Sequence, residues 1–316
     1  MINKATVIRS TGSWYEVESD IGKVVKCRIK GKFRLQGMKL TNPVAVGDIV
    51  DIEIEDIEEK TGIIKNIHPR KNIVVRQSPR KKHFLHLLAS NIDQAILIIT
   101  INQPKLKQGF IDRFLLMTEP YNIPVSIIFN KSDIYNEGDL RVFDYLRQVY
   151  TKIGYDCFLS SAIEREGIDT IKKKMKDKIS LVAGQSGVGK STLINSIQPK
   201  LNLKTKELSN YTGKGQHTTT FAEMFDLDFG GKIIDTPGIK NLSFNNLEVL
   251  DVAHNFREFF NKSKLCKYSN CTHRNEPGCA VKEAMENEEI SELRYYNYLQ
   301  ILEEIEAQNH WERHKM

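Results

Sequence analysis

The sequence predicts three successive domains: a small β-barrel, an α/β domain built on a parallel sheet, and a helical C-terminal domain. Residues 1–72 contain short strands punctuated by glycines and lack helical periodicity, which is typical of a small all-β domain. Over residues 73–241, continuous apolar strands alternate with helical stretches, which indicates a parallel sheet covered on both faces. Residues 242–316 are mainly helical and carry a cluster of cysteines. A length of 316 residues agrees with two or more domains.

The first domain is expected to contain five strands. They are predicted at residues 5–8, 14–18, 24–28, 49–55 and 63–67. Five short strands in so small a space favour a Greek-key barrel of the oligonucleotide-binding (OB) type, and an SH3-like barrel fits the same pattern.

Positive charge is concentrated in the N-terminal part of the chain. Residues 1–90 hold 17 Lys+Arg against 10 Asp+Glu, a net charge of +7, whereas the remaining residues hold 29 against 30. The excess lies in two basic blocks, residues 23–39 and 65–82, on either side of an acidic run. Two such blocks in one small domain favour a polyanionic partner.

Composition excludes several classes of protein. A hydrophobic content of 40% with 27% charged residues is that of a globular chain and excludes a disordered or collagen-like one. The longest apolar run, residues 95–101, is far shorter than the roughly 20 residues that cross a bilayer, and the N-terminus lacks the apolar stretch of a signal peptide. Five cysteines are an odd number, which argues against a disulfide framework. We therefore expect a cytoplasmic protein without a membrane partner.

A phosphate-binding pattern follows the predicted strand 179–183. The run Gly184-Gln185-Ser186-Gly187-Val188-Gly189-Lys190-Ser191 matches G-x-x-x-x-G-K-[ST] and leads into a predicted helix at 190–197. Its glycines allow backbone N–H groups to surround phosphates at the N-terminus of that helix. Lys190 is expected to reach the β- and γ-phosphates as a catalytic residue, Ser191 to bind Mg²⁺, and Thr192 to belong to the same nucleotide site.

Two further elements predict that the base is guanine. Asn130-Lys131-Ser132-Asp133 follows the predicted strand 124–129 and resembles the N-K-x-D element of GTPases. One carboxylate, that of Asp133, accepts hydrogen bonds from both N1–H and the exocyclic amine of guanine, a donor pair that adenine lacks. Ser160-Ser161-Ala162, after the predicted strand 157–159, resembles the weaker guanine-contacting element S-A-K/L.

The remaining nucleotide elements concern Mg²⁺ and the γ-phosphate. Asp235-Thr236-Pro237-Gly238 closes the predicted strand 232–234, so Asp235 is expected in the Mg²⁺ shell and the Gly238 N–H near the γ-phosphate. Thr218-Thr219-Thr220 lies between the phosphate loop and this element, and we expect Thr219 to complete the Mg²⁺ shell from a switch loop.

The order of these elements is rotated. In an ordinary small GTPase the phosphate loop comes first, whereas here N-K-S-D and S-S-A precede it. Every element still follows a predicted strand, so the sheet is expected to be the same with its termini relocated by circular permutation.

Four potential metal ligands lie within the C-terminal domain. Cys266, Cys271, His273 and Cys279 form the spacing C-x₄-C-x-H-x₅-C. Three thiolates and one imidazole favour one tetrahedral, structural Zn²⁺ per chain, because a catalytic zinc keeps a coordination position open. The other two cysteines, Cys27 and Cys157, are expected to fill apolar positions.

Over essentially its whole length the chain resembles the ribosome small-subunit-dependent GTPase (RsgA) family, which combines an OB barrel, a circularly permuted GTPase and a zinc-binding domain. The resemblance implies hydrolysis of GTP to GDP and phosphate, binding to the small ribosomal subunit and its rRNA late in assembly, and stimulation of hydrolysis by that subunit. We further expect a monomer.

Position 239 is Ile where Ras-type GTPases carry the water-orienting Gln, which predicts slow intrinsic hydrolysis. His217, just before the three threonines, is the candidate catalytic residue to position the water.

Two other functions fit part of the pattern. A permuted GTPase of large-subunit assembly would share the central domain but generally lacks the barrel and the Cys₃His site. A non-enzymatic zinc- and RNA-binding module would not need intact Lys190, Ser191, Asp133 and Asp235.

Overall fold

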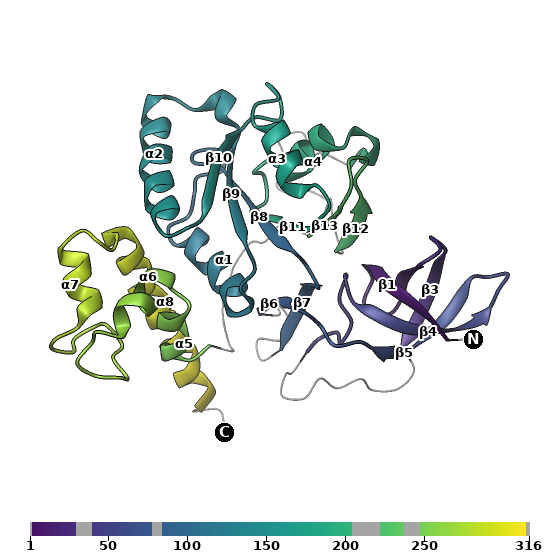
Figure 1. Cartoon of the computed structure of the whole chain (residues 1–316), viewed down its shortest axis with the longest axis horizontal. Coiled ribbons are helices and arrows are strands. Elements are labelled where there is room, and N and C mark those ends of the chain that lie inside the picture. Colours follow the sequence, from purple (N-terminus) through teal and green to yellow (C-terminus); the bar gives the residue numbers. More distant parts are fainter. Residues whose placement is uncertain (1, 30–39, 78–83, 204–221, 237–246, 314–316) are drawn as a thin grey trace.

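The computed structural model describes residues 2–29, 40–77, 84–203, 222–236 and 247–313. Figure 1 shows the barrel on one side of the central α/β domain and the C-terminal helices on the other. The barrel, the α/β part and the C-terminal helices therefore follow one another in space as they do in sequence.

The N-terminal domain is a closed five-stranded barrel. Its strands pair in the order β1-β2-β3-β5-β4, and a further β1–β4 pairing closes the barrel. The pair β3–β5 is parallel and the others are antiparallel, which is the strand order of an OB-type barrel. Their bounds are β1 (Ile2–Ser10), β2 (Tyr15–Ser19), β3 (Val24–Ile29), β4 (Ile49–Asp56) and β5 (Thr61–Ile67).

A hairpin that the sequence did not predict joins the barrel to the central domain. Strands β6 (Ile73–Gln77) and β7 (Leu85–Ser90) form a two-stranded antiparallel sheet. At its base the buried Asp48 carboxylate accepts two hydrogen bonds of 2.6 Å from Arg70 and one of 2.6 Å from Ser90 Oγ. This network ties the end of the barrel to the hairpin.

The central domain is built on five parallel strands in the order β10-β9-β8-β11-β13, with β12 antiparallel at the edge. Alternate residues of each strand serve opposite faces: Leu97 and Ile99 pack in one apolar cluster, Ile96 and Ile98 in another. The strands are β8 (Gln94–Ile99), β9 (Val125–Asn130), β10 (Asp156–Ser160), β11 (Ile179–Gly184), β12 (Glu223–Asp226) and β13 (Lys232–Asp235).

Helices cover both faces of this sheet, as expected for a doubly wound fold (Figure 1). Residues of α1 and α2 pack in the first cluster, and residues of α3 and α4 pack in the second. The bounds are α1 (Phe110–Thr118), α2 (Glu137–Lys152), α3 (Ile168–Met175) and α4 (Lys190–Ile197), with short 3₁₀ turns η1 (Glu119–Tyr121), η2 (Ser132–Ile134) and η3 (Pro199–Leu201).

The barrel and the central domain share one continuous sheet. Barrel strand β1 pairs with β12 through Arg9 and Glu223, which makes a sheet of eleven strands. Lys232 of β13 also donates a hydrogen bond of 3.1 Å to Glu18 of β2.

The C-terminal domain packs on α1. Its helices are α5 (Val249–His254), α6 (Arg257–Ser263), α7 (Ala280–Glu286) and α8 (Glu292–Arg313). Phe256, Phe259 and Tyr298 belong to the same apolar cluster as α1, so the two domains share a core. Among the described residues, no helix is both long and apolar enough to span a membrane.

Candidate nucleotide and metal sites

The phosphate loop lies between the end of β11 and the start of α4, as predicted. Gly187 and Gly189 have φ angles of 90° and 84°, which side-chain-bearing residues rarely adopt. A Cβ at Gly184 would lie 2.4 Å from the Ile98 carbonyl oxygen, and one at Gly189 would lie 2.6 Å from Asn130 Nδ2. The glycines are therefore required both by the turn and by the close approach of neighbouring strands.

Lys190 and Asp235 meet at the base of this loop. The buried Lys190 ammonium donates hydrogen bonds to the Asp235 carboxylate and to the Thr236 carbonyl oxygen. The Thr236 hydroxyl donates in turn to the Val182 carbonyl oxygen at 3.0 Å. Ser191 and Thr192 occupy the first turn of α4, so the described part of the predicted phosphate and Mg²⁺ site comes together at one sheet edge.

The guanine elements meet at the same edge. Asn130 Nδ2 donates to the Val188 carbonyl oxygen of the phosphate loop at 2.8 Å, and Ser160 Oγ donates to Asn130 Oδ1 at 3.0 Å. Ser161 Oγ donates to Asp133 Oδ1 at 2.5 Å, which orients the carboxylate predicted to read guanine. These bonds join three strand ends that are far apart in the sequence.

Lys131 and Ala162 complete the described guanine elements. Lys131 Nζ donates to the Gln103 carbonyl oxygen at 2.8 Å, and burial lowers the pKa of this lysine below its usual value. Ala162 O accepts a hydrogen bond of 3.1 Å from Ser196 of α4.

The sequence analysis missed Tyr135, whose hydroxyl contacts the guanine element at Asn130. Its hydroxyl donates to the Asn130 carbonyl oxygen at 2.9 Å and accepts a hydrogen bond of 3.1 Å from the Ile101 backbone. Burial raises the pKa of Tyr135 to about 12, so the phenol stays protonated and able to donate. Its spacing of five residues from Asn130 gave no motif by which it could be found.

The switch residues lie outside the described part of the chain. These are His217, the threonines Thr218, Thr219 and Thr220, and the segment that holds Gly238 and Ile239. Their roles remain predictions from the sequence.

The four predicted metal ligands come together in the C-terminal domain. The ligand atoms of Cys266, Cys271, His273 and Cys279 all lie within 4.8 Å of one another. His273 Nδ1 is 3.7 Å from Cys266 Sγ and 3.4 Å from Cys279 Sγ. With Zn–S of about 2.3 Å and Zn–N of about 2.1 Å, a tetrahedral ion places S and N about 3.6 Å apart. The group therefore has the geometry to hold zinc.

Glu276 organises the loop between these ligands and was not predicted. Its carboxylate accepts hydrogen bonds from Thr272 N (2.7 Å), Thr272 Oγ1 (2.6 Å), Arg274 N (2.9 Å) and Asn275 N (3.1 Å). Burial alone would raise the pKa of Glu276, but these hydrogen bonds lower it to about 2. The backbone between Cys271 and His273 is thereby fixed to one carboxylate.

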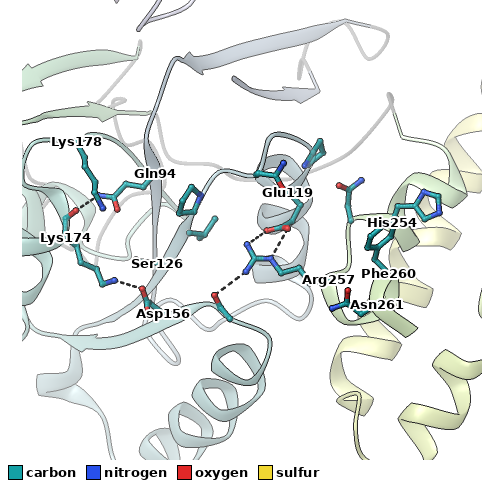
Figure 2. A pocket seen from close by; sticks show the side chains of 16 residues that line it. Gln94, Glu119, Ser126, Asp156, Lys174, Lys178, His254, Arg257, Phe260 and Asn261 are labelled. Carbon is teal, nitrogen blue, oxygen red and sulfur yellow. Dashed lines mark hydrogen bonds and ion pairs between the residues drawn. The ribbon is translucent and has the colours of Figure 1, made fainter. Parts of the chain in front are cut away.

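A separate groove lies at the opposite edge of the sheet, where strands β8, β9 and β10 begin, and its volume is about 760 Å³. Figure 2 shows ion pairs between charged side chains that line it. Lys174 pairs with Asp156, and Arg257 pairs with Glu119 at 2.9 Å. The groove is distant from the phosphate loop and is not the nucleotide site.

Comparisons with known proteins agree with this arrangement. The RsgA N-terminal domain matches residues 4–64 and the RsgA GTPase domain matches residues 67–245. A small ribosomal subunit biogenesis GTPase RsgA from Phocaeicola vulgatus is 52% identical over 303 residues, which cover 96% of this chain and 97% of the relative. The relative from Flavobacterium johnsoniae is 50% identical over 94% of this chain and 92% of its own length.

Two solved structures share the whole architecture. YjeQ from Thermotoga maritima matches with a TM-score of 0.75 and 37% identity, over 96% of this chain and 99% of that one. YloQ, described as a circularly permuted GTPase, matches with a TM-score of 0.71 and 29% identity over 98% and 96%. Three findings agree: the rotated order of the nucleotide motifs, the five-stranded barrel and these matches. The chain belongs to the RsgA family of circularly permuted GTPases.

Proposed function

We propose that this chain is a cytoplasmic, monomeric GTPase that binds the small ribosomal subunit and its rRNA during the subunit's biogenesis, and that the subunit stimulates its hydrolysis of GTP to GDP and phosphate. The observation that carries the GTPase assignment is the bridge made by Asn130. Its side chain bonds both the phosphate loop at Val188 and the guanine element at Ser160. A base and a phosphate chain bound there would occupy a single site.

Each residue of the site has a proposed role. Backbone N–H groups of residues 184–189 and the Lys190 ammonium would hold the phosphates, and the Asp133 carboxylate would select guanine. GTPases use Mg²⁺, which neutralises charge that develops on the phosphates, and Ser191, Thr219 and Asp235 would hold it here. Gly238 would sense the γ-phosphate.

We propose that His217 positions the attacking water. In Ras-type GTPases a Gln orients this water, and the corresponding position here is Ile239. We assign the role to His217 instead. Changing His217 to Ala is expected to lower stimulated turnover while GTP affinity stays nearly constant, because the interaction is made in the transition state. Full stimulated turnover in that variant would contradict the role.

One Zn²⁺ per chain is proposed for the group Cys266, Cys271, His273 and Cys279. Four protein ligands fill a tetrahedral shell, so the ion would be structural. Metal analysis of protein purified without chelator is expected to find about one zinc per chain. Protein that contains no zinc would contradict this assignment.

The outward face of β3 is the proposed rRNA contact. Its side chains alternate, so that Val25 and Cys27 are buried in the barrel while Lys26 and Arg28 are exposed. Lysine and arginine on such a face contact RNA phosphates. Each contact that is lost makes the slope of log affinity against log salt concentration shallower by about one.

The experiment that tests the function compares GTP turnover with and without purified small subunits. Wild-type protein is expected to turn over GTP slowly alone and much faster with subunits. Changing Lys26 and Arg28 to Gln is expected to weaken subunit binding and flatten its salt dependence, while the matched changes at Lys173 and Lys176, exposed on the central domain, leave both unaltered. Turnover that the subunits do not alter would refute the proposed stimulation.

A further inference from the structure

The C-terminal domain holds α1 of the GTPase domain at both ends. Arg294 of α8 is buried and donates from Nη1 to Oδ1 of Asp112, in the first turn of α1, at 2.6 Å. At the other end, Arg257 of α6 donates from Nε to the carboxylate of Glu119, the C-cap of α1, at 3.0 Å. Figure 2 shows this second contact at the edge of the groove. Helix α1 and the C-terminal domain are therefore joined as one body.

The contact at Asp112 is the more enclosed of the two. Asp112 is fully buried and also accepts hydrogen bonds from Tyr150 at 2.8 Å and from Asn297 of α8 at 2.5 Å. Arg294 has a second carboxylate partner, Glu258 of α6, at 2.7 Å and 2.9 Å. Breaking a buried pair by removing one partner is costly, so this contact fixes the relative position of the two domains.

The same end of α1 is connected to the nucleotide site. Residues 100–109 join β8 to α1, and within them Gln103 O accepts the hydrogen bond from Lys131 and Ile101 N donates to Tyr135. Pro104 lies against the phosphate loop, since a Cβ at Gly187 would be 3.7 Å from Pro104 Cδ. Asp112 is thus only a few residues from a loop that contacts both the phosphate-binding and the guanine-binding elements.

We infer that Asp112 and Arg294 are a positioning pair for the stimulated reaction. They fix the C-terminal domain to the end of α1 that faces the nucleotide site. A displacement of that domain therefore moves residues 100–109 and, through them, the phosphate loop. This inference rests on the proposed stimulation by the small subunit. It adds the structural connection between the C-terminal domain and the phosphate loop. We expect the same connection to act in the other direction, so that the nucleotide bound at the phosphate loop also affects the stability of α8.

The test uses two variants of the full-length protein that each remove one carboxylate from the same arginine. Asp112→Asn removes the negative charge from the contact between domains, and Glu258→Gln removes it from the contact within the C-terminal domain, so each exchanges an ion pair for a weaker neutral hydrogen bond. Either variant leaves Arg294 one carboxylate partner, so a general loss of stability affects both. Intrinsic turnover and KM for GTP are expected to stay within about twofold of wild type in each, because neither residue lies in the nucleotide site.

The ratio of stimulated to intrinsic turnover separates the variants. Asp112→Asn is expected to lower it about tenfold, within the range of coupling between sites, while Glu258→Gln leaves it near the wild-type value. An equal loss in both variants, or no loss in Asp112→Asn, would overturn the inference. If Asp112→Asn does not fold, Asn297→Ala removes one neutral donor to Asp112 and is expected to lower the ratio about fivefold, and an unaltered ratio there would overturn it as well.

Hydrogen exchange tests the same coupling without ribosomes. In wild-type protein the exchange of α8 amides is expected to differ between GDP and a non-hydrolysable GTP analogue, and in Asp112→Asn this difference disappears while the phosphate loop still responds. Identical exchange of α8 with both nucleotides in wild type would overturn the inference and leave the proposed function intact. A wild-type enzyme that subunits do not stimulate would instead refute the proposed function.

Discussion

Glu276 gives the sharpest prediction about the C-terminal domain and its candidate zinc site. Its carboxylate accepts four hydrogen bonds from the loop that carries the ligands, and Glu276→Gln replaces one acceptor oxygen by an amide donor that faces backbone N–H groups. Hydrogen bonding lowers the pKa from 4.5 to about 2 against the opposing effect of burial. That difference corresponds to about 3 kcal/mol in favour of the charged form, and partial exposure of the side chain reduces the expected contribution to about 2 kcal/mol.

This contribution has a defined pH window. Because the folded-state pKa lies below the unfolded one, the stabilisation is fully present above about pH 4.5 and is lost as the pH falls towards 2. Between pH 5 and 8 the difference in melting temperature between wild type and Glu276→Gln is therefore expected to stay constant, at roughly 4 to 8 °C, because the C-terminal and GTPase domains share a core and unfold as one large unit.

The assay is thermal denaturation of the full-length protein combined with zinc competition against a chromophoric chelator. Removing a residue that orients metal ligands is expected to weaken zinc binding about 10- to 100-fold. Glu283→Gln is the matched control, because Glu283 is exposed on α7 of the same domain. A Glu276→Gln variant with the melting temperature and zinc affinity of the control would refute the reasoning.

Three further predictions concern the nucleotide site and the barrel. Asp133→Asn is expected to shift preference from guanine to xanthine nucleotides, because an amide donates to the xanthine C2 carbonyl; unchanged preference in competition binding would contradict the assignment. Lys190→Ala is expected to abolish GTP hydrolysis in a phosphate-release assay, since it removes the ammonium expected at the β- and γ-phosphates, and measurable turnover would show that another cation serves there. Asp48→Asn is expected to destabilise the protein by about 3 to 5 kcal/mol, because it leaves the buried Arg70 guanidinium without its charged partner. Urea denaturation measures this loss, and a loss below about 1 kcal/mol would contradict the prediction.

The grouping of the nucleotide motifs and of the four candidate metal ligands was predictable because their signals are local. The phosphate loop needs glycines at fixed spacing beside a strand, and the four candidate metal ligands lie within residues 266–279, so the sequence alone places each group. The barrel was predictable in its strands, and the choice between the OB and SH3-like types, which the sequence left open, depends on pairings such as β3 with β5.

The buried charges were not predictable. Asp112 and Arg294 are separated by 182 residues in the sequence, and each alone looks like an ordinary surface residue of a helix. Nothing in the spacing says that a carboxylate in the first turn of α1 will face a guanidinium from α8. The hairpin β6–β7 was missed for a related reason, since its packing depends on contacts with residues such as Val46 and Phe114 elsewhere in the chain.

The shared sheet also determines how the barrel can be studied. Strand β12 has β13 on one side and β1 of the barrel on the other. Removing the barrel would leave β12 as an unprotected edge, and such edges recruit strands from other molecules. A truncated protein is therefore expected to self-associate, and a loss of ribosomal response in it would not distinguish a missing RNA contact from aggregation. Charge substitutions on the outward face of β3 avoid this, because they leave the pairing of β1 with β12 in place.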